Sequence, residues 1–190
     1  MKNYVLTPGP VPVPEFVMLE MAKPIIHHRT EEFEAIFSKA TEGLKKVFMT
    51  KEEVLILASS GTGAMDAAIS NTLSKGDKAL VINGGKFGER WLKICKAYGV
   101  ETIEHKVEWG HAVQPLKIKE ILKGNSDIKA ILVQASETST GVEHPIKDIA
   151  KLTKDRNDII LIVDGITAVG AFPVEFDNWG IDILIGGSQK

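Results

Sequence analysis

Three separated segments of this 190-residue chain carry groups that could act at one site. Lys190 follows the apolar stretch Ile181–Ile185 and two glycines, and Asp164 ends another apolar stretch, which begins at Leu161. The small-residue turn Ser59–Gly63 precedes a candidate helix. Because open α/β sheets bind their ligands just past the carboxyl ends of strands, we expect the three groups to meet there.

The three groups have complementary chemistry. The Lys190 amine can form an imine, and a carboxylate in surroundings as apolar as those of Asp164 needs a cationic partner to offset its desolvation. A turn of small residues at a helix start presents N–H groups and the positive end of the helix dipole to an anion. Pyridoxal phosphate (PLP) has an aldehyde, a pyridine nitrogen and a phosphate, so the combination predicts a PLP site.

Each group has a plainer interpretation when it is taken alone. A terminal lysine is usually solvated, an aspartate at a strand end can bind a metal or cap a turn, and a Ser or Thr in a strand-to-helix turn can merely cap the helix. Two nucleotide motifs also compete for Ser59–Gly63. The turn lacks the third glycine of a dinucleotide-binding fingerprint, since Asp66 stands there, and it lacks the Gly-Lys-Ser/Thr ending of a P-loop.

Two further loops follow candidate strands and could line the same pocket. Glu137–Gly141 is rich in hydroxyl groups, and Phe87 begins a helix where its ring could stack on a flat heteroaromatic ring. The plainer alternatives are a polar turn and a core phenylalanine. His27 and His28 have no Cys or carboxylate at metal-ligand spacing, so we interpret them as structural or peripheral and expect no metal site. Cys95 lies on an apolar helix face, which favours a buried, unreactive thiol.

Composition favours a globular protein with small-molecule ligands. Hydrophobic residues make up 44% of the chain, and the formal net charge of -2 gives no field that would attract nucleic acid or acidic lipid. The single Cys95 excludes an intrachain disulfide, and no apolar run approaches the roughly 20 residues of a membrane helix. The start Met1–Tyr4 lacks the apolar core of a signal peptide. We therefore expect a cytoplasmic protein that binds neither nucleic acid nor membrane.

Strand and helix candidates alternate along most of the chain. The proline-rich Leu6–Pro14 arm is expected to be extended and irregular. From Thr30 to Phe48, apolar residues recur at three- and four-residue steps, which predicts a long amphipathic helix. Further helices are expected near Thr62–Leu73, Lys86–Tyr98, Pro115–Leu122 and Pro145–Lys154. The expected strands are Val54–Ala58, Ala79–Asn83, Thr102–Val107, Ala130–Gln134, Ile159–Asp164 and Ile183–Ile185.

Several of these strands are continuous apolar runs, which is typical of strands buried on both faces. The expected architecture is therefore an α/β, three-layer fold, with helices on both sides of a mostly parallel sheet. We expect residues 1–30 to form an N-terminal proline-rich arm and segment, and residues 31–190 to form the PLP-binding large domain.

In this order, the motifs resemble the class V aminotransferases among the fold type I PLP enzymes. They are most similar to the branch of alanine–glyoxylate and serine–glyoxylate (or serine–pyruvate) aminotransferases. The resemblance covers nearly the whole chain. It rests on the blocks Leu6–Pro10, Ser59–Met65, Asn83–Arg90, Glu137–Gly141, Val163–Asp164 and Gly187–Lys190.

The resemblance implies a role for each matching residue. Lys190 would bond to the coenzyme aldehyde and then move the proton of the substrate α-carbon, and Asp164 would keep the pyridine nitrogen protonated. Phe87, where many relatives have a tryptophan, would stack on the ring. The other implied contacts are Ser60, Gly61, Thr62 and Gln189 at the phosphate, Thr138 at the ring hydroxyl, and the backbone of Gly9 at the substrate carboxylate.

The implied reaction moves the amino group of alanine or serine to a 2-oxo acid such as glyoxylate or pyruvate, by ping-pong chemistry in a homodimer. The main alternative within the fold is a cysteine desulfurase or lyase, although desulfurases usually stack a histidine where this chain has Phe87. A non-catalytic fragment or scaffold and an NAD-binding oxidoreductase are alternatives from other classes. The last is weakened because Ala79–Asn83 lacks the acidic residue that binds a ribose.

The chain departs from the family in length. Family members are much longer, and this sequence stops at the lysine, before the C-terminal domain with its substrate-carboxylate arginine. In the family, a strand after the lysine returns antiparallel between the last and first parallel strands. Without it, Val54–Ala58 would be an exposed edge, so we expect an incomplete record of a longer enzyme.

Overall fold

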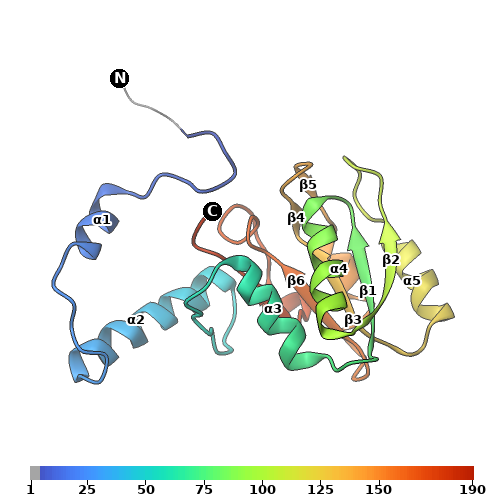
Figure 1. Ribbon diagram of the computed structural model, residues 1–190, viewed down its shortest axis with the longest axis horizontal. Coiled ribbons are helices and arrows are strands. Elements are labelled where there is room, and N and C mark those ends of the chain that lie inside the picture. Colours follow the sequence, from blue (N-terminus) through green and yellow to red (C-terminus); the bar gives the residue numbers. More distant parts are fainter. Residues whose placement is uncertain (1–4) are drawn as a thin grey trace.

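The computed structural model describes residues 5–190, so the Met1–Tyr4 start, with its predicted lack of a signal peptide, lies outside the described residues. A five-stranded parallel sheet with the order β2-β1-β3-β6-β7 forms the centre (Figure 1). Its strands are β1 (Lys78–Asn83), β2 (Glu101–Lys106), β3 (Ile128–Gln134), β6 (Ile160–Asp164) and β7 (Ile183–Ile185). The expected mostly parallel α/β sheet is confirmed.

The strand register places the carboxyl ends of β3, β6 and β7 side by side at one edge of the sheet. Gln134 at the end of β3 pairs with Asp164 at the end of β6, and Asp164 pairs in turn with Ile185 at the end of β7. A short antiparallel hairpin follows β3 directly. Its strands are β4 (Ser136–Glu137) and β5 (Val142–Glu143). The loops after β3, β6 and β7 therefore all leave the sheet at the same edge.

Helices cover both faces of the sheet, and the alternation of side chains along each strand divides the core in two. In β1, Ala79 and Val81 join the core beneath α3 and α4, whereas Leu80 and Ile82 join the core beneath α5 and α6. This arrangement is the three-layer fold expected from the sequence. The helices are α3 (Gly61–Thr72), α4 (Lys86–Tyr98), α5 (Pro115–Gly124), α6 (Ile146–Ala150) and the short α7 (Phe176–Trp179) before β7.

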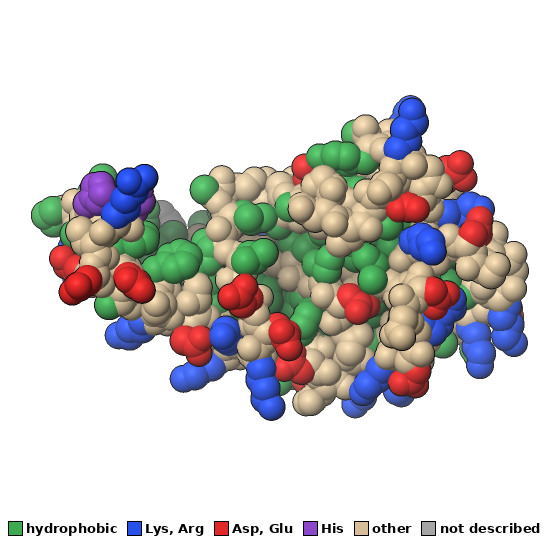
Figure 2. All heavy atoms as spheres, turned by 90° about the horizontal axis from the view of Figure 1, so that it is seen from below, with side chains coloured by type: hydrophobic (Ala, Val, Ile, Leu, Met, Phe, Trp, Pro, Cys, Tyr) green, Lys and Arg blue, Asp and Glu red, His purple; other side chains and the backbone are tan. Residues whose placement is uncertain are grey.

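The N-terminal elements lie to one side of the sheet (Figure 1). The predicted amphipathic helix is α2 (Glu31–Phe48), and Phe33 N–H donates to the side chain of its N-cap, Thr30. A second helix, α1 (Glu15–Met21), was not expected from the sequence, whereas the arm before it is irregular as predicted. Neither α1 nor α2 has a buried residue. Figure 2 shows hydrophobic side chains at the surface of this end of the molecule, beside the histidines.

Two expectations about the elements are wrong. Val54–Ala58 forms no strand, and Leu55 is 78% exposed, because β7 is the edge of the sheet and no neighbouring strand offers backbone partners. The helix expected over Pro145–Lys154 ends at Ala150. Its carbonyl oxygen accepts hydrogen bonds from the hydroxyl and the backbone N–H of Thr153, which favours turns over a continued helix.

Among the helices within residues 5–190, none has the length and apolar character needed to cross a membrane.

Candidate active site

Asp164 is a buried carboxylate at the carboxyl end of β6. Its residue is 5% exposed, and its Oδ1 atom accepts a hydrogen bond of 3.0 Å from the Ile166 backbone N–H. Burial raises the pKa of Asp164 to about 6, while the Ile166 N–H and the positive charges of Arg90 and Lys190 act in the opposite direction. A cation that contacts this carboxylate would offset the cost of its burial.

Lys190 reaches the same edge of the sheet from β7. The Gly165 N–H, next to Asp164, donates to the Ile185 carbonyl at 2.8 Å, which fixes the two strand ends side by side. The Nζ atom of Lys190 lies 5.9 Å from the centre of the Phe87 ring. The structure thus brings together a lysine, an aspartate and an aromatic ring from three distant segments.

The N-terminal arm lies against the end of the chain. The Val11 N–H donates to the Gln189 carbonyl at 3.3 Å. A Cβ atom at Gly9 would lie 3.0 Å from the same carbonyl oxygen and 2.5 Å from Cδ of Lys190. Gly9 therefore contacts the lysine predicted to lie at the reaction centre, and a side chain at this position would require Lys190 to shift.

The start of α3 lies beside the end of β6. Ser60 is the N-cap, but its hydroxyl makes no capping hydrogen bond, and both Ser60 and Thr62 are exposed. A Cβ atom at Gly61 would overlap the side chain of Ile166, which follows Asp164 by two residues. The free N–H groups and hydroxyls of this helix start are therefore close to the buried carboxylate and can bind an anion.

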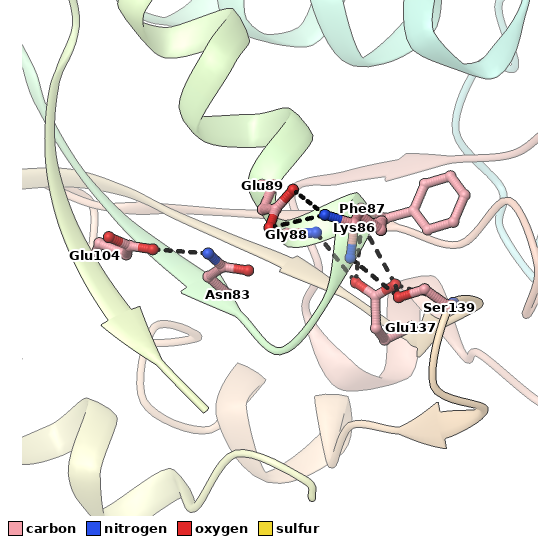
Figure 3. A network of polar contacts seen from close by, with 8 residues as sticks. All are labelled: Asn83, Lys86, Phe87, Gly88, Glu89, Glu104, Glu137 and Ser139. Carbon is pink, nitrogen blue, oxygen red and sulfur yellow. Dashed lines mark hydrogen bonds and ion pairs between the residues drawn. The ribbon is translucent and has the colours of Figure 1, made fainter. Parts of the chain in front are cut away.

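The loop after β4 completes the edge. The Thr138 hydroxyl lies 2.6 Å from the hydroxyl of Thr167, which belongs to the turn after β6. Glu137, the residue before it, is fully buried and accepts hydrogen bonds from the start of α4 (Figure 3). From the sequence, only the hydroxyl groups of this loop could be recognised as candidate ligands. Glu137 is the one acidic residue of the segment Glu137–Gly141, and this was the feature from which a buried carboxylate could have been suspected.

Phe87 is half-buried in the first turn of α4, with the Arg90 guanidinium 4.7 Å from the centre of its ring. Sequence reasoning missed Arg90 as a group near the site. The three-residue spacing of Phe87 and Arg90 on a helix was the signal, because it places both side chains on one face.

Other candidate residues lie apart from this arrangement. His27 and His28 stack with ring centres 4.8 Å apart on the exposed N-terminal segment. Cys95 is fully buried, and burial raises the pKa of its thiol to about 11, as expected of an unreactive thiol. Two hollows of about 400 and 540 Å³ lie between the end of α2 and residues 169–178, and none of the implied coenzyme contacts lines them. Within residues 5–190, no three His, Cys, Asp or Glu residues are grouped to hold a metal ion.

Comparison with known families decides how this edge of the sheet is interpreted. The sequence model of the family "Aminotransferase class-V" matches residues 15–190. The chain belongs to the class V aminotransferase family. This match confirms the resemblance inferred from the sequence motifs, and members of this family depend on PLP.

The proteins that are similar in sequence to this chain have different names. The chain is 44% identical over 191 residues to a protein of Synechococcus sp. (strain PCC 6716) named the small subunit of a soluble hydrogenase, covering 100% of this chain and 50% of that protein. It is 35% identical over 193 residues to a serine–glyoxylate aminotransferase of Methylorubrum extorquens, covering 100% of this chain and 48% of the relative. This class V aminotransferase chain thus spans about half the length of the curated relatives it matches.

A solved structure has the same fold. The alanine–glyoxylate aminotransferase from Nostoc sp. superposes with a TM-score of 0.92 at 27% identity, covering 97% of this chain and 49% of that one.

The residues of this class V aminotransferase chain fit the coenzyme of the family. Asp164 is a buried carboxylate that has no cationic hydrogen-bond partner among residues 5–190 and suits a protonated pyridine nitrogen. Gly61 and Gly9 stand where a Cβ atom would overlap Ile166 or Lys190, so these glycines let the start of α3 and the N-terminal arm lie close to the residues of the site. The start of α3 supplies donors for a phosphate.

Proposed function

We propose that the protein is a PLP-dependent aminotransferase that transfers the amino group of a small amino acid, alanine or serine, to a 2-oxo acid such as glyoxylate or pyruvate. The observation that carries this proposal is the meeting of Lys190, Asp164 and the start of α3 at one edge of the sheet in a class V aminotransferase chain. The serine–glyoxylate and alanine–glyoxylate names of two similar proteins support the choice of substrates.

When it is bound, PLP supplies an electron sink for the charge that develops at the substrate α-carbon. The Asp164 carboxylate would accept a hydrogen bond from the pyridine N–H and so hold its proton in place. The Lys190 amine would anchor the coenzyme and, once the substrate amine has replaced it, would remove the α-proton and return it. The reaction would run as two half-reactions, in which the keto acid of the first leaves before the second substrate binds.

The remaining contacts would bind and orient the ligands. Backbone N–H groups of Gly61 and Thr62, with the Ser60 and Thr62 hydroxyls, would hold the phosphate, assisted by Gln189. Phe87 would cover one face of the ring and exclude water from it, and Thr138 would bind the ring hydroxyl. The backbone of Gly9, which contacts Lys190, would bind the substrate carboxylate.

The test is the substitution Lys190→Ala in the intact protein. We expect the visible absorbance band of the bound coenzyme to disappear, because no other amine would hold PLP covalently. The matched control is Lys86→Ala, since Lys86 is a mostly exposed lysine near the site whose amine pairs with Glu89. A band that persists in Lys190→Ala would show that another lysine is the anchor.

Substrate choice needs a separate measurement. Wild-type protein with bound PLP would be mixed with alanine, serine, aspartate or phosphoserine, and the loss of the visible band would be followed. We expect alanine or serine to give the fastest loss. A spectrum that no amino acid changes would contradict transamination and would favour the non-catalytic alternative.

We also propose that the protein is a homodimer. The support is the absence of any buried residue in α1 and α2, whose apolar side chains would be covered by a partner. The cytoplasmic location expected from the sequence stays a prediction.

A further inference from the structure

The buried carboxylate of Glu137 has no part in the proposed reaction, yet it lies between two residues that the reaction uses. Glu137 is fully buried in β4, and its neighbour Thr138 is an expected coenzyme contact. Figure 3 shows the Glu137 carboxylate pointing at the first turn of α4, which carries Phe87. A buried carboxylate is costly unless hydrogen-bond donors surround it, so its partners indicate what it is for.

Those partners are the free N–H groups at the start of α4. The Glu137 Oε2 atom accepts from the Phe87 N–H at 3.2 Å and from the Gly88 N–H at 3.1 Å. The Lys86 N–H donates to the Ser139 hydroxyl at 3.0 Å, and that hydroxyl donates to Glu137 Oε1 at 2.6 Å. Since the N-cap residue, Gly85, has no side chain, the loop after β3 caps α4 from about 50 positions away in the sequence.

Three consecutive residues, Glu137, Thr138 and Ser139, connect the start of α4 to the candidate site. Glu137 and Ser139 bind the start of α4, whereas Thr138 between them has its hydroxyl on Thr167 in the turn after β6. A Cβ atom at Gly85 would lie 2.6 Å from Cδ and 2.7 Å from Cγ of Glu137, so the helix start and the carboxylate are in direct contact. These contacts therefore link the position of Phe87 to that of Thr138.

We propose that Glu137 is a positioning residue, which caps α4 and thereby holds Phe87 against the coenzyme ring. This inference rests on the proposed function. The negative charge of Glu137 lies at the positive end of the α4 dipole, and two amides donate to one of its oxygens. Loss of the carboxylate removes the acceptor of the Phe87 N–H, leaves the Gly88 N–H with only the Gln134 side-chain oxygen, and so loosens the first turn of α4.

The experiment compares Glu137→Ala and Glu137→Gln with wild type and with Glu143→Ala. Glu143 is the matched control, because it is an exposed carboxylate on the other strand of the same hairpin. Two quantities are measured on the intact protein. The first is amide hydrogen exchange of peptides that span Lys86–Trp91 and Lys93–Tyr98, without PLP. The second is PLP affinity, together with the circular dichroism of the bound coenzyme.

We expect Glu137→Ala to speed exchange in the first turn of α4 by about tenfold, with little change in Lys93–Tyr98, because only the capped end loses its acceptors. PLP affinity should fall by about tenfold and the dichroism of the coenzyme should change, since Phe87 is no longer held. Glu137→Gln keeps the shape and one acceptor oxygen, so it should recover part of both losses. Glu143→Ala should match wild type.

The outcomes separate the two proposals. Unchanged exchange in Glu137→Ala, or faster exchange with wild-type PLP affinity and dichroism, overturns the positioning role and leaves the proposed function standing. Failure of the wild-type protein to bind PLP overturns the proposed function and the role of Glu137 toward the ring. If Glu137→Ala does not fold, Glu137→Gln decides, and wild-type values for both measurements overturn the positioning role.

Discussion

Asp164 combines a strong electrostatic penalty with a position at the centre of the site. Its carboxylate loses solvent on burial, and one backbone N–H of Ile166 does not compensate, so its pKa rises to about 6. A group that ionises at this cost is poorly explained as a purely structural feature, because a neutral side chain of the same shape would be cheaper. The arrangement is understandable if a cationic ligand binds there.

The first prediction concerns Asp164→Asn without PLP. Because the folded pKa is raised above the ordinary value of 3.8, the folded protein holds a proton here that the unfolded chain has lost between about pH 4 and pH 6. The contribution of Asp164 to the free energy of unfolding therefore falls as pH rises through this range, by up to about 3 kcal/mol. The variant lacks this loss, so it should become more stable than wild type toward pH 7.

Denaturant unfolding at about pH 4 and about pH 7 measures this difference. The control is Asp148→Asn, at an exposed carboxylate that pairs with Lys151. With PLP present the order should reverse at neutral pH, because the uncharged amide cannot offset a pyridinium. Parallel pH profiles of wild type and Asp164→Asn would count against the buried, costly carboxylate.

Among single residues, those that could be placed from the sequence are the ones whose location depends only on their own strand. The placement of Lys190 and Asp164 could be predicted because each follows an apolar run and strand ends meet at one edge of a parallel sheet, whereas their roles stay a prediction. Glu137 could not be assigned its role, because the amides that it caps belong to Phe87 and Gly88 in another segment. Such a cap depends on tertiary structure, which no local pattern encodes.

Among the elements, α3 is the one whose placement depends most on a single contact. Gly61 begins the helix against Ile166, and a methyl group there would overlap the isoleucine side chain. Ile166 is itself 9% exposed and packs in the core beneath α3. The close approach lets the helix start lie next to Asp164, which the proposed phosphate site requires.

The second prediction is that Gly61→Ala lowers the free energy of unfolding by about 1–2 kcal/mol and weakens PLP binding, because the added methyl displaces the helix start. Ile166→Val removes the overlapping carbon, so the double variant should show a favourable coupling of about 1 kcal/mol in a double-mutant cycle. Gly43→Ala is the control. It lies within α2 with open space around it, and it should stabilise the helix slightly. Additive effects of Gly61→Ala and Ile166→Val would refute the contact.

A helix or strand could be predicted from the sequence when the elements that it packs against are present in the fold. The strand over Ala79–Asn83 and the helix Lys86–Tyr98 pack against each other, and the pattern of each could be recognised locally. Val54–Ala58 has an equally apolar pattern but no adjacent strand, so its backbone stays unpaired. Apolar content indicates what a segment needs to bury, and only the tertiary neighbours decide whether it becomes a strand.

At the scale of the whole molecule, apolar surface is concentrated outside the sheet domain. Leu19 and Met21 in α1 are 63% and 80% exposed, and Leu55 is 78% exposed. Apolar side chains on adjacent exposed elements usually mark a contact with another protein surface. The chain spans about half the length of its relatives, and the proposed homodimer would cover this surface with a partner subunit.

The last prediction introduces a charge on the apolar side of α1 to test whether a partner subunit covers this helix. If a partner subunit covers the helix, Leu19→Glu places a carboxylate in a desolvated interface and should shift the intact protein from dimer to monomer in light scattering at micromolar concentration. Lys119→Glu, at an exposed position of α5 outside the proposed interface, changes charge without removing an apolar side chain and should leave the dimer intact. If α1 is instead covered within one subunit, Leu19→Glu should lower the free energy of unfolding while the mass stays that of a dimer. A wild-type protein that is monomeric at this concentration would contradict the proposed homodimer directly, because an interface that buries α1 and α2 from both subunits should not dissociate there.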